Sequence, residues 1–476
     1  MQLFDQFGNI NNRIHFIGVA GIGMSGLAML VAKKGAIVSG SDLVSSGEIV
    51  ENLKKFGVKF TPKHDIGNIN DKIDLVVTSS AISVDNCELQ QAYALGIKVI
   101  PRAKLLALVM QNQVGVAVTG THGKTTTTSI LGNILTFSQL DPTIVVGGKV
   151  INNNNLQIRV GEGDLFVAEA DESDASFLYL TPFLAVLTSF DLDHMENFQG
   201  DKAKLGQAFI DFLHRLPVNG VAVVSADDQN LAEILNKVHR RCISYGFSQD
   251  ADYRIDGYRL TEGLYHFELW SPENIKESYS IKQSGRHNVL NAVAAIVAAK
   301  QLGVSVEDIK NSLLDFAGVG RRFELIGELN IPQIKSPIKF IDDYGHHPQA
   351  IKYIVNTVRE LWPQKRLVVC FEPHRYSRLA HLFDDFIKEL SMADVVVLLP
   401  VYHCNETIVA NIDSVLLQQR IGEGAILSDQ FSLSDILAEN LQENDIVVAM
   451  GAGNISKFIR DTFINLSKRF SESCCG

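Results

Sequence analysis

Short apolar runs alternate with segments of helical period along nearly the whole chain, and this alternation restricts the fold more than any other feature. The runs Leu75 to Thr78 and Val114 to Thr119, for example, have the length and composition of buried strands. Strands that alternate with helices form parallel sheets whose crossover helices cover the faces. The sequence therefore predicts the α/β fold class.

The chain has 476 residues, enough for about three domains of roughly 150 residues each. We divide it into residues 1–108, 109–320 and 321–476. The first and last segments are predicted to be Rossmann-like, because their strands run into loops and then helices. Within the second, Tyr253 to Ile281 alternates apolar and polar residues around two glycines, as antiparallel hairpins do. We therefore expect a small antiparallel β layer in the central domain.

A glycine-rich turn follows the first predicted strand. Its G-x-G-x-x-G pattern comprises Gly21, Gly23 and Gly26. Such glycines let the backbone approach a pyrophosphate, and the following helix offers free N–H groups. Asp42 ends the next strand, where a carboxylate can reach a sugar or base. Taken alone, the turn indicates a dinucleotide-dependent oxidoreductase, and a turn that serves only helix–strand packing is the structural alternative.

A second glycine-rich turn, from Gly120 to Thr126, lies between a strand and a predicted helix from Thr127 to Phe137. Its Gly-Lys-Thr ending predicts a phosphate loop of the P-loop ATPase type, in which Lys124 reaches the terminal phosphates and the Thr125 hydroxyl ligates magnesium. The loop is shorter than a Walker A motif, because Val118 stands where that motif has its first glycine.

Carboxylates follow two neighbouring strands of the central segment. Glu169 comes at the end of one, and Asp191, Asp193 and His194 follow the other. Because ligands gather outside the carboxyl ends of parallel strands, we expect Thr125, Glu169 and His194 to converge on a magnesium ion. Helix caps and solvated acidic loops are the alternative interpretation of these residues.

In the third segment, Pro348 suits the first turn of a helix, which places His346 and His347 at a helix N-terminus. Arg375 and Arg378 follow another strand, where guanidinium groups can grip a carboxylate. The alternative is that both arginines are surface charges.

Composition excludes several classes of function. Lys and Arg number 43 against 54 Asp and Glu, a formal net charge of −11, which argues against nucleic acid and an anionic membrane as partners. The six cysteines form no C-x-x-C pair, and the N-terminus lacks the basic start of a signal peptide, so we expect a cytoplasmic protein with reduced thiols. The apolar stretch from Ile14 to Val31 is predicted to be a strand, turn and helix rather than a membrane span.

Together the motifs resemble those of the Mur ligases, the ATP-dependent amide-forming enzymes of peptidoglycan synthesis. The central segment carries G-T-H-G-K-T-T from Gly120, A-E-A-D-E-S-D from Ala168, D-H-M from Asp193 and G-R-H-N-x-x-N from Gly285. Four further segments are similar to members that join L-alanine to the lactyl carboxylate of UDP-N-acetylmuramate through an acyl phosphate: Gly18 to Gly26, Gly320 to Glu324, Asp342 to Pro348 and Pro373 to Arg378. The resemblance thus implies UDP-N-acetylmuramate, L-alanine, ATP and one or two Mg²⁺ ions as ligands.

The resemblance also implies roles for individual residues. Catalysis is expected from Lys124, His194 and His346, with His194, His346 or the leaving phosphate as the base that deprotonates the alanine amine. ATP is expected at Gly120, Thr121, His122, Gly123, Lys124, Thr125, Thr126, His287, Asn288, Asn291, Arg322 and Asp343. The UDP-sugar is expected at Gly18, Gly21, Gly23, Met24, Ser25, Gly26, Asp42, His64 and Ser80. L-Alanine is expected at Tyr344, His346, Arg375 and Arg378, and magnesium at Thr125, Glu169 and His194.

Three alternatives remain open at this level. A murein-peptide ligase would add a preformed peptide to the same UDP-sugar. A dinucleotide-dependent oxidoreductase would leave the Gly120 loop without a role, and a regulatory nucleotide-binding module would bind without catalysis. Lys202 and Lys204 are the nearest candidates for the carbamylated lysine that holds a second metal in some related ligases. Oligomeric state and the choice among L-alanine, glycine and L-serine also stay open.

Overall fold

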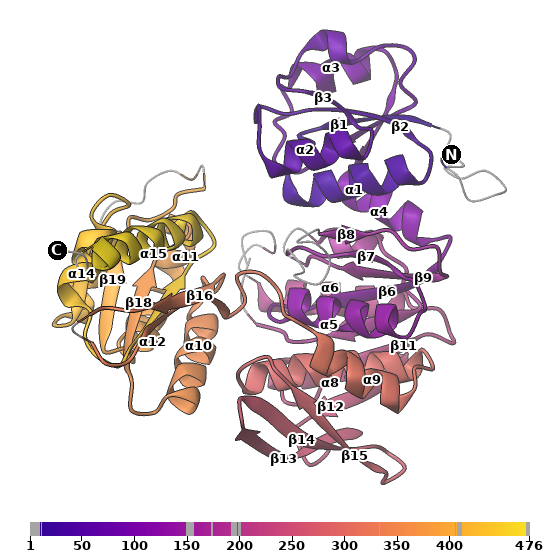
Figure 1. The fold of residues 1–476 in the computed structure, drawn as a ribbon. Helices are drawn as coiled ribbons and strands as arrows, with labels where there is room; N and C mark the ends of the chain where they lie inside the picture. Colours follow the sequence, from indigo (N-terminus) through magenta and orange to yellow (C-terminus); the bar gives the residue numbers. More distant parts are fainter. Residues whose placement is uncertain are drawn as a thin grey trace. The chain divides into compact units, whose positions relative to one another are not determined.

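The computed structural model describes residues 10, 12–148, 157–172, 175–191, 198, 201–332, 334–404, 406 and 412–472. The chain divides into two compact units, one of residues 1–282 and 288–317 and the other of residues 283–287 and 318–476. Each unit contains its own sheets and its own core of buried apolar side chains. We describe each unit by itself (Figure 1).

The larger unit begins with a five-stranded parallel sheet of order β3-β2-β1-β4-β5. Its strands are β1 (Arg13–Ile17), β2 (Ile37–Ser41), β3 (Lys59–Thr61), β4 (Leu75–Thr78) and β5 (Lys98–Pro101). Its helices are α1 (Ile22–Lys33), α2 (Glu48–Lys55), α3 (Cys87–Ala94) and α4 (Arg102–Met110), with the short η1 (Ile66–Asn68). The strand order reverses between β1 and β4, the kind of place where α/β sheets bind ligands. The predicted strand, turn and helix within residues 14–31 are confirmed by β1 and α1.

The same unit continues with a ten-stranded mixed sheet of order β15-β14-β13-β12-β11-β10-β6-β9-β7-β8. Its strands are β6 (Val114–Thr119), β7 (Thr143–Val145), β8 (Ile158–Arg159), β9 (Leu165–Glu169), β10 (Leu184–Leu187), β11 (Val221–Ser225), β12 (Arg241–Gly246), β13 (Tyr253–Thr261), β14 (Leu264–Trp270) and β15 (Lys276–Ile281). Its helices are α5 (Lys124–Phe137), α6 (Lys202–His214), α7 (Gln229–Leu235), α8 (Arg286–Gln301) and α9 (Val306–Asp315), with the short η3 (Ser176–Tyr179). Strands β6, β9, β10 and β11 run parallel at its centre.

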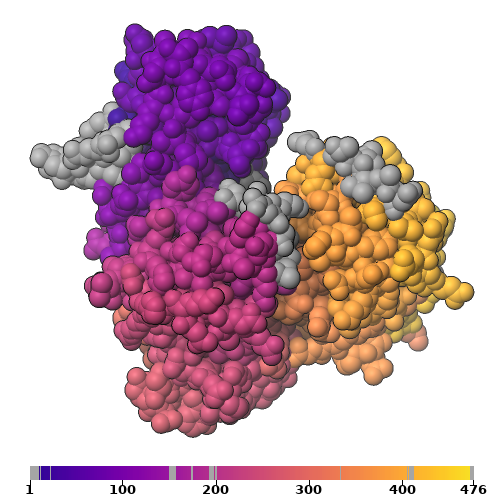
Figure 2. Space-filling model, turned by 180° about the vertical axis from the view of Figure 1, so that it is seen from behind, coloured from indigo at the N-terminus to yellow at the C-terminus, as the bar shows by residue number. Residues whose placement is uncertain are grey.

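The antiparallel hairpins predicted near residues 253–281 are present, but they are not a separate layer. Strand β13 pairs parallel with β12, and β14 and β15 extend the same sheet as an antiparallel meander. Between β13 and β14, Glu262 and Gly263 both have positive φ, as a type I′ hairpin turn requires. The meander lies at the end of the unit opposite the five-stranded sheet (Figures 1 and 2).

The first two sheets share one core. A single cluster of buried apolar residues includes Phe16 of β1, Leu105 of α4, Phe166 of β9 and Phe209 of α6. Leu108, where the first predicted domain ends, lies inside α4 and packs against this cluster. Lys33 Nζ also donates to the Val160 carbonyl at 3.0 Å, beyond β8.

The smaller unit contains a six-stranded sheet of order β16-β17-β21-β18-β19-β20, in which only β16 is antiparallel. Its strands are β16 (Glu324–Leu329), β17 (Ile338–Asp343), β18 (Arg366–Phe371), β19 (Val395–Leu398), β20 (Ala425–Leu427) and β21 (Asp445–Met450). Its helices are α10 (Pro348–Leu361), α11 (Tyr376–His381), α12 (Phe383–Leu390), α13 (Ser414–Ile421), α14 (Leu433–Asn440) and α15 (Ile455–Glu472). The predicted Pro348 start of α10 is confirmed, and the His347 side chain caps that helix.

In the described part of the chain, no helix combines the length and the apolar character needed to cross a bilayer. Cys87, Cys242, Cys370 and Cys404 are free thiols, and Cys370 is fully buried. Cys474 and Cys475 lie outside the described residues, as does the run of asparagines at residues 152–155, whose composition predicts an exposed loop. Residues 471–476 form a polar terminal segment that is expected to fray, and the described part of it, Ser471 and Glu472, is the end of α15.

Candidate functional site

The N-terminal glycine turn is held by hydrogen bonds from β2. Gly18 has a φ of 78°, and the amides of Gly18 and Val19 donate to the Ser41 carbonyl at 2.8 and 3.0 Å. Asp42 Oδ2 accepts from the Ala20 amide at 2.9 Å, and its Oδ1 accepts from the Val44 amide at 3.2 Å. Asp42 thus braces the turn at the carboxyl end of β2, beside the start of α1.

The other residues expected to bind the UDP-sugar differ in exposure. Met24 and Ser25 are buried in the first turns of α1, whereas Ser80 is exposed after β4. His64 lies after β3 with its side chain 17% exposed. Arg102, which the motifs did not single out, brings its guanidinium within 3.2 Å of where a Cβ would stand on Gly23. Arg102 is the first residue of α4 and directly follows β5, and this position at the carboxyl end of a strand is the sequence signal that could have identified it.

The phosphate loop follows β6 and is fixed by the segment that follows β10. The Thr121 amide donates to the Ser189 carbonyl at 3.1 Å, and the His122 amide donates to Ser189 Oγ at 2.8 Å. Gly120 has a φ of 123° and no space for a Cβ, which would stand 2.7 Å from the Ser189 amide nitrogen. Helix α5 begins at Lys124, three residues earlier than predicted, because Gly123 turns the chain with a φ of 82°.

Lys124 lies among carboxylates. Its Nζ donates to Glu172 Oε1 at 2.8 Å and to the Gly120 carbonyl at 2.7 Å. Burial opposes the charge of this amine, but Glu172, Asp171 and Glu169 outweigh it and raise the pKa of Lys124. A lysine that stays cationic inside the loop suits binding to a phosphate chain.

The structure brings together two of the three predicted magnesium ligands. Thr125 Oγ1 donates to Glu169 Oε1 at 2.9 Å, and Glu169 Oε2 accepts from the Gly147 amide at 2.7 Å. His194, the third predicted ligand, lies outside the described residues together with Asp174 and Asp193. Lys202 Nζ bonds Asn230 Oδ1 at 2.6 Å and Glu233 Oε2 at 3.2 Å, so this side chain contacts α7.

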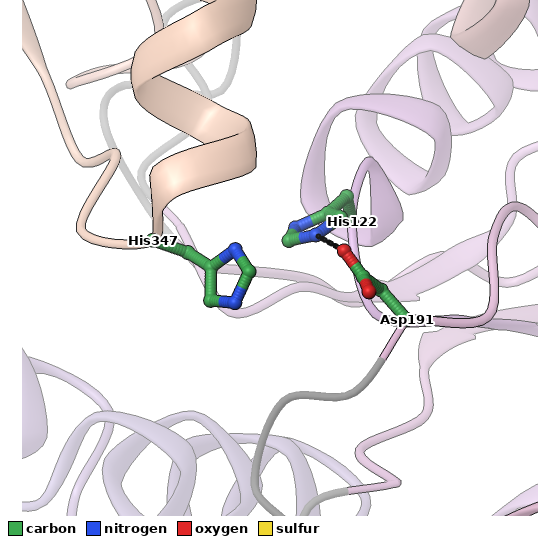
Figure 3. A group of neighbouring side chains, drawn as sticks. All are labelled: His122, Asp191 and His347. Carbon is green, nitrogen blue, oxygen red and sulfur yellow. Dashed lines mark hydrogen bonds and ion pairs between the residues drawn. The ribbon is translucent and has the colours of Figure 1, made fainter. Parts of the chain in front are cut away.

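His122 and Asp191 form a pair beside the loop. His122 Nε2 lies 3.3 Å from Asp191 Oδ2, as the dashed line in Figure 3 shows. Thr121 Oγ1 accepts from the Asp191 amide at 2.8 Å. The sequence marks Asp191 only as one of several acidic residues after β10, and the structure shows that it contacts two residues of the loop, Thr121 and His122. His347, also drawn in Figure 3, belongs to the other unit, where its Nδ1 accepts from the Gln349 amide.

Helix α8 contributes Asn288 and Asn291, which the resemblance places on the adenine side of ATP. Asn291 Nδ2 donates to Asn288 Oδ1 at 3.1 Å, and Thr127 Oγ1 donates to Asn291 Oδ1 at 3.4 Å. A Cβ on Gly123 would stand 2.2 Å from Asn291 Oδ1, so α8 touches the phosphate loop directly. His287 clusters with the other unit, where its ring stacks on Tyr353 at 5.2 Å.

In the smaller unit, Arg321 and Arg322 both stack on the ring of Tyr344, with their guanidinium carbons 4.9 and 5.2 Å from its centroid. Asp343 is buried and accepts from the amides of Phe323 and Gly345 at 2.8 and 2.7 Å. Burial raises the pKa of Asp343, against the opposing effect of Arg322. Asp343 therefore holds the segment that carries the two arginines.

Four aromatic rings form a chain from Tyr344 into the loop after β18. The Tyr344 and His346 rings meet edge to face at 5.2 Å, and His346 lies 5.6 Å from His374. His374 stacks on Tyr402 at 5.3 Å. Arg378 is buried, and its Nη1 donates to the His374 carbonyl at 3.4 Å. Of the residues expected to bind L-alanine, His346 and Arg378 thus contact His374, and Tyr344 contacts His346. The sequence motifs contain His374 but do not single it out.

Arg375 begins the same loop's short helix. It stands at the N-cap of α11 with a φ of 70°. Burial opposes the charge of Glu406, but hydrogen bonds from Ser377 and, to a smaller extent, the charge of Arg375 lower the pKa of Glu406. The arginine is thus placed beside an anion of its own unit, at the carboxyl end of β18.

Comparison with known proteins identifies the family of the chain. Residues 13–114 match the profile described as "Mur ligase family, catalytic domain", residues 118–299 match "Mur ligase middle domain", and residues 321–453 match "Mur ligase, glutamate ligase domain". The UDP-N-acetylmuramate–L-alanine ligase of Hydrogenovibrio crunogenus is 44% identical over 455 residues, which are 94% of this chain and 97% of that protein. The chain belongs to the Mur ligase family.

Solved structures of Mur ligases share the fold. The UDP-N-acetylmuramate-alanine ligase of Thermotoga maritima is 26% identical and superposes with a TM-score of 0.79, covering 97% of this chain and 100% of that one. A murein peptide ligase of Psychrobacter arcticus superposes with a TM-score of 0.70 at 23% identity, covering 96% and 99% of the two chains. The expected three-domain α/β architecture is therefore confirmed as that of a Mur ligase, and its middle domain contains the phosphate loop described above.

Proposed function

We propose that this Mur ligase joins the amine of L-alanine to the lactyl carboxylate of UDP-N-acetylmuramate with consumption of ATP. The observation that carries the proposal is the 44% identity, across 94% of the chain, to a UDP-N-acetylmuramate–L-alanine ligase. The product is UDP-N-acetylmuramoyl-L-alanine, with ADP and phosphate, and the reaction belongs to peptidoglycan synthesis. A dinucleotide-dependent oxidoreductase would not need the ordered phosphate loop at Gly120 to Thr126.

The carboxylate must be activated, because it is a poor acceptor for an amine. A lactyl oxygen attacks the γ-phosphorus of ATP and forms an acyl phosphate with release of ADP, and the alanine amine then displaces phosphate from the acyl carbon. In this proposal Lys124 and the loop amides stabilise the charge of the transferring phosphoryl group, and the support is that the Lys124 amine lies against the Gly120 carbonyl of the loop. Candidate acceptors for the amine proton are His194, His346 and the departing phosphate.

The oxygen ligands of a magnesium ion are proposed to come from Thr125 and Glu169, whose side chains meet at 2.9 Å, together with the nitrogen ligand His194. A hydroxyl and a carboxylate are hard oxygen donors of the kind that Mg²⁺ takes. When bound, Mg²⁺ neutralises negative charge on the phosphate oxygens. The residues present in the described part of this site therefore fit the ion.

We further propose that residues 1–108 bind the UDP-sugar, residues 109–320 bind ATP and residues 321–476 bind L-alanine. Support comes from the glycine turn at β1, the phosphate loop at β6, and Tyr344, His346, Arg375 and Arg378 around the loops after β17 and β18. A cytoplasmic location belongs to the same proposal, because the four described cysteines are free thiols.

The test is phosphate release from ATP and magnesium in the presence of UDP-N-acetylmuramate. It is run without an amino acid, with L-alanine, and with L-alanyl-D-glutamyl-diaminopimelate. Release that requires both the UDP-sugar and L-alanine supports the proposal. Release with the tripeptide alone would instead identify a peptide ligase, and no release with any acceptor would favour a binding module without catalysis.

A further inference from the structure

Glu88 is a buried carboxylate that none of the roles above uses. It lies in the first turn of α3, and its side chain is 0% exposed. Asn68 Nδ2 donates to its Oε1 at 2.6 Å, and the Asp65 amide donates to the same oxygen at 3.1 Å. Ser41 Oγ donates to its Oε2 at 2.5 Å. A carboxylate is buried in this way only where such hydrogen bonds compensate for the lost water.

Two histidines approach the same carboxylate. His64 Nδ1 lies 3.3 Å from Glu88 Oε2, and His15 Nε2 lies 3.5 Å from that oxygen. Burial alone would raise the pKa of Glu88, but the approach of His15 and the hydrogen bonds from Ser41, Asn68 and the Asp65 amide lower it to about 2. Glu88 is therefore a fixed negative charge at neutral pH.

The hydrogen-bond directions determine which nitrogen of His64 carries a proton. His64 Nδ1 lies 3.0 Å from Ser41 Oγ, whose own hydrogen is donated to Glu88. The ionised Glu88 has no hydrogen to donate, so Nδ1 must supply the hydrogen in its contacts with both groups. Within the described residues, no group bonds the opposite nitrogen, Nε2, and the side chain is 17% exposed. The Nδ1 edge of the His64 ring is thus held by Ser41 and Glu88, and the Nε2 edge is available to a ligand.

The same network reaches the glycine turn. The Ser41 carbonyl accepts from the Gly18 and Val19 amides, while the Ser41 hydroxyl donates to Glu88. Ser41 ends β2, next to the switch point of the five-stranded sheet. Glu88 therefore connects His64 to the backbone of the turn where the UDP-sugar is expected.

We propose that Glu88 is a positioning residue of the UDP-sugar site, which fixes the His64 ring with its proton on Nδ1 and presents Nε2 to the UDP moiety. This inference rests on the proposed function and extends it to a residue that no motif contains. Carboxylates that hold the far nitrogen of a functional histidine set its tautomer and orientation, and their removal costs about 10- to 100-fold in related settings.

The first test measures steady-state kinetics of wild type, Glu88→Gln, His64→Ala and the double variant. Glu88→Gln keeps the shape of the side chain but removes the charge that fixes His64. We expect it to raise the KM for UDP-N-acetylmuramate about tenfold, while the KM for ATP and kcat change less than about twofold. In the His64→Ala background, the same change should add almost nothing, because its effect acts through His64.

A merely structural Glu88 gives a different pattern. In that case Glu88→Gln would change kcat and the KM of every substrate together, or it would raise the KM for the UDP-sugar by the same factor in the His64→Ala background as in wild type. Either result overturns the proposal. Glu51→Gln is the matched control, because Glu51 is an exposed carboxylate on α2 paired only with Lys54 among the described residues. This control should leave all constants unchanged.

A second pair of variants applies even if Glu88→Gln fails to fold. In His64→Gln the amide stands near the position of Nε2, whereas in His64→Asn it stands near that of Nδ1. We expect His64→Gln to bind UDP-N-acetylmuramate more tightly than His64→Asn, as measured by titration calorimetry without ATP. Equal affinities, or the reverse order, would overturn the proposal. Calorimetry measures binding without turnover. A protein that binds the UDP-sugar but releases no phosphate would therefore contradict the ligase function, while the comparison of the two His64 variants would still be valid.

Discussion

At the scale of single residues, Lys124 shows how neighbouring carboxylates keep a buried amine positively charged within the phosphate loop. Its side chain is 14% exposed, and its amine contacts Glu172, whose side chain is 3% exposed. Three carboxylates keep the amine protonated despite burial. Lys124 contacts the phosphate loop and Glu172, and the glycine turn of β1 belongs to a different sheet. Phosphate chemistry and UDP-sugar binding should therefore depend on separate residues.

We expect Lys124→Ala to abolish acyl phosphate formation and to leave the Kd for UDP-N-acetylmuramate within about twofold of wild type. The change also leaves Glu172 buried without its cationic partner, which costs about 3 kcal/mol or more in such pairs. The double variant Lys124→Ala, Glu172→Gln is therefore the folding control. Phosphate release and titration calorimetry are the measurements, and joint loss of both functions in a folded variant would contradict separate sites.

Acid should remove the stabilising contribution of Glu88. Its pKa is about 2 in the folded protein against 4.5 for an ordinary glutamate, so the unfolded chain binds the proton more readily. The contribution to the free energy of unfolding is complete above pH 4.5 and is lost as the pH falls towards 2. Urea unfolding of wild type and Glu88→Gln should therefore show a difference that shrinks on acidification. A difference that stays constant over this range would contradict an ionised Glu88.

At the scale of elements, local pattern predicted most strands and helices, because apolar period and glycine position are properties of neighbouring residues. Helix α10 is an example, since Pro348 marks its start in the sequence, whereas the start of α5 was placed three residues too late, because Gly123 turns the chain and lets the helix begin at Lys124. The approach of Thr125 to Glu169 was predictable as well, because both follow parallel strands of one sheet. Glu88 was not, because its partners come from β1, β2 and the segment between β3 and β4. The spacing of these residues along the sequence does not predict that they meet around Glu88.

The close approach of β2 to the glycine turn gives a prediction at this scale. A Cβ on Gly40 would stand 2.6 to 2.9 Å from three side-chain carbons of Val19, which is fully buried. We expect Gly40→Ala to displace the turn, lower the melting temperature and raise the KM for the UDP-sugar. Adding Val19→Gly should bring the KM for the UDP-sugar back towards the wild-type value, because it removes all three obstructing carbons, the nearest of which is the Val19 Cβ at 2.6 Å. Failure of the second change to compensate would show that the contact is not the cause.

At the scale of the whole molecule, the chain has two units with separate cores. The buried cluster around β1, β9 and α6 lies entirely in the larger unit, and two further clusters lie on either face of the smaller unit's sheet. In the smaller unit, Arg366 Nε and Nη2 bond both oxygens of the fully buried Asp445, at 2.9 and 3.0 Å. This ion pair joins the first residues of β18 and β21.

Calorimetry should therefore resolve two unfolding transitions. We expect UDP-N-acetylmuramate at about 100 times its Kd to stabilise the larger unit by about 2.7 kcal/mol and to raise only that transition. Arg366→Met should lower only the other transition, because it leaves Asp445 buried without its partner, at a cost of about 3 kcal/mol. A single transition that shifts with both treatments would show that the units unfold together.

The turn of the β13–β14 hairpin gives this enzyme a site where another polypeptide can be inserted. Glu262 and Gly263 form an exposed two-residue tip, and three strands, β12, β11 and β10, separate its hairpin from β6 and the phosphate loop. Exposed loop tips are where polypeptide insertions are best tolerated. A fluorescent reporter or an affinity peptide spliced between these two residues would thus travel with the ATP-binding domain, and an enzyme tagged there would keep both chain ends free.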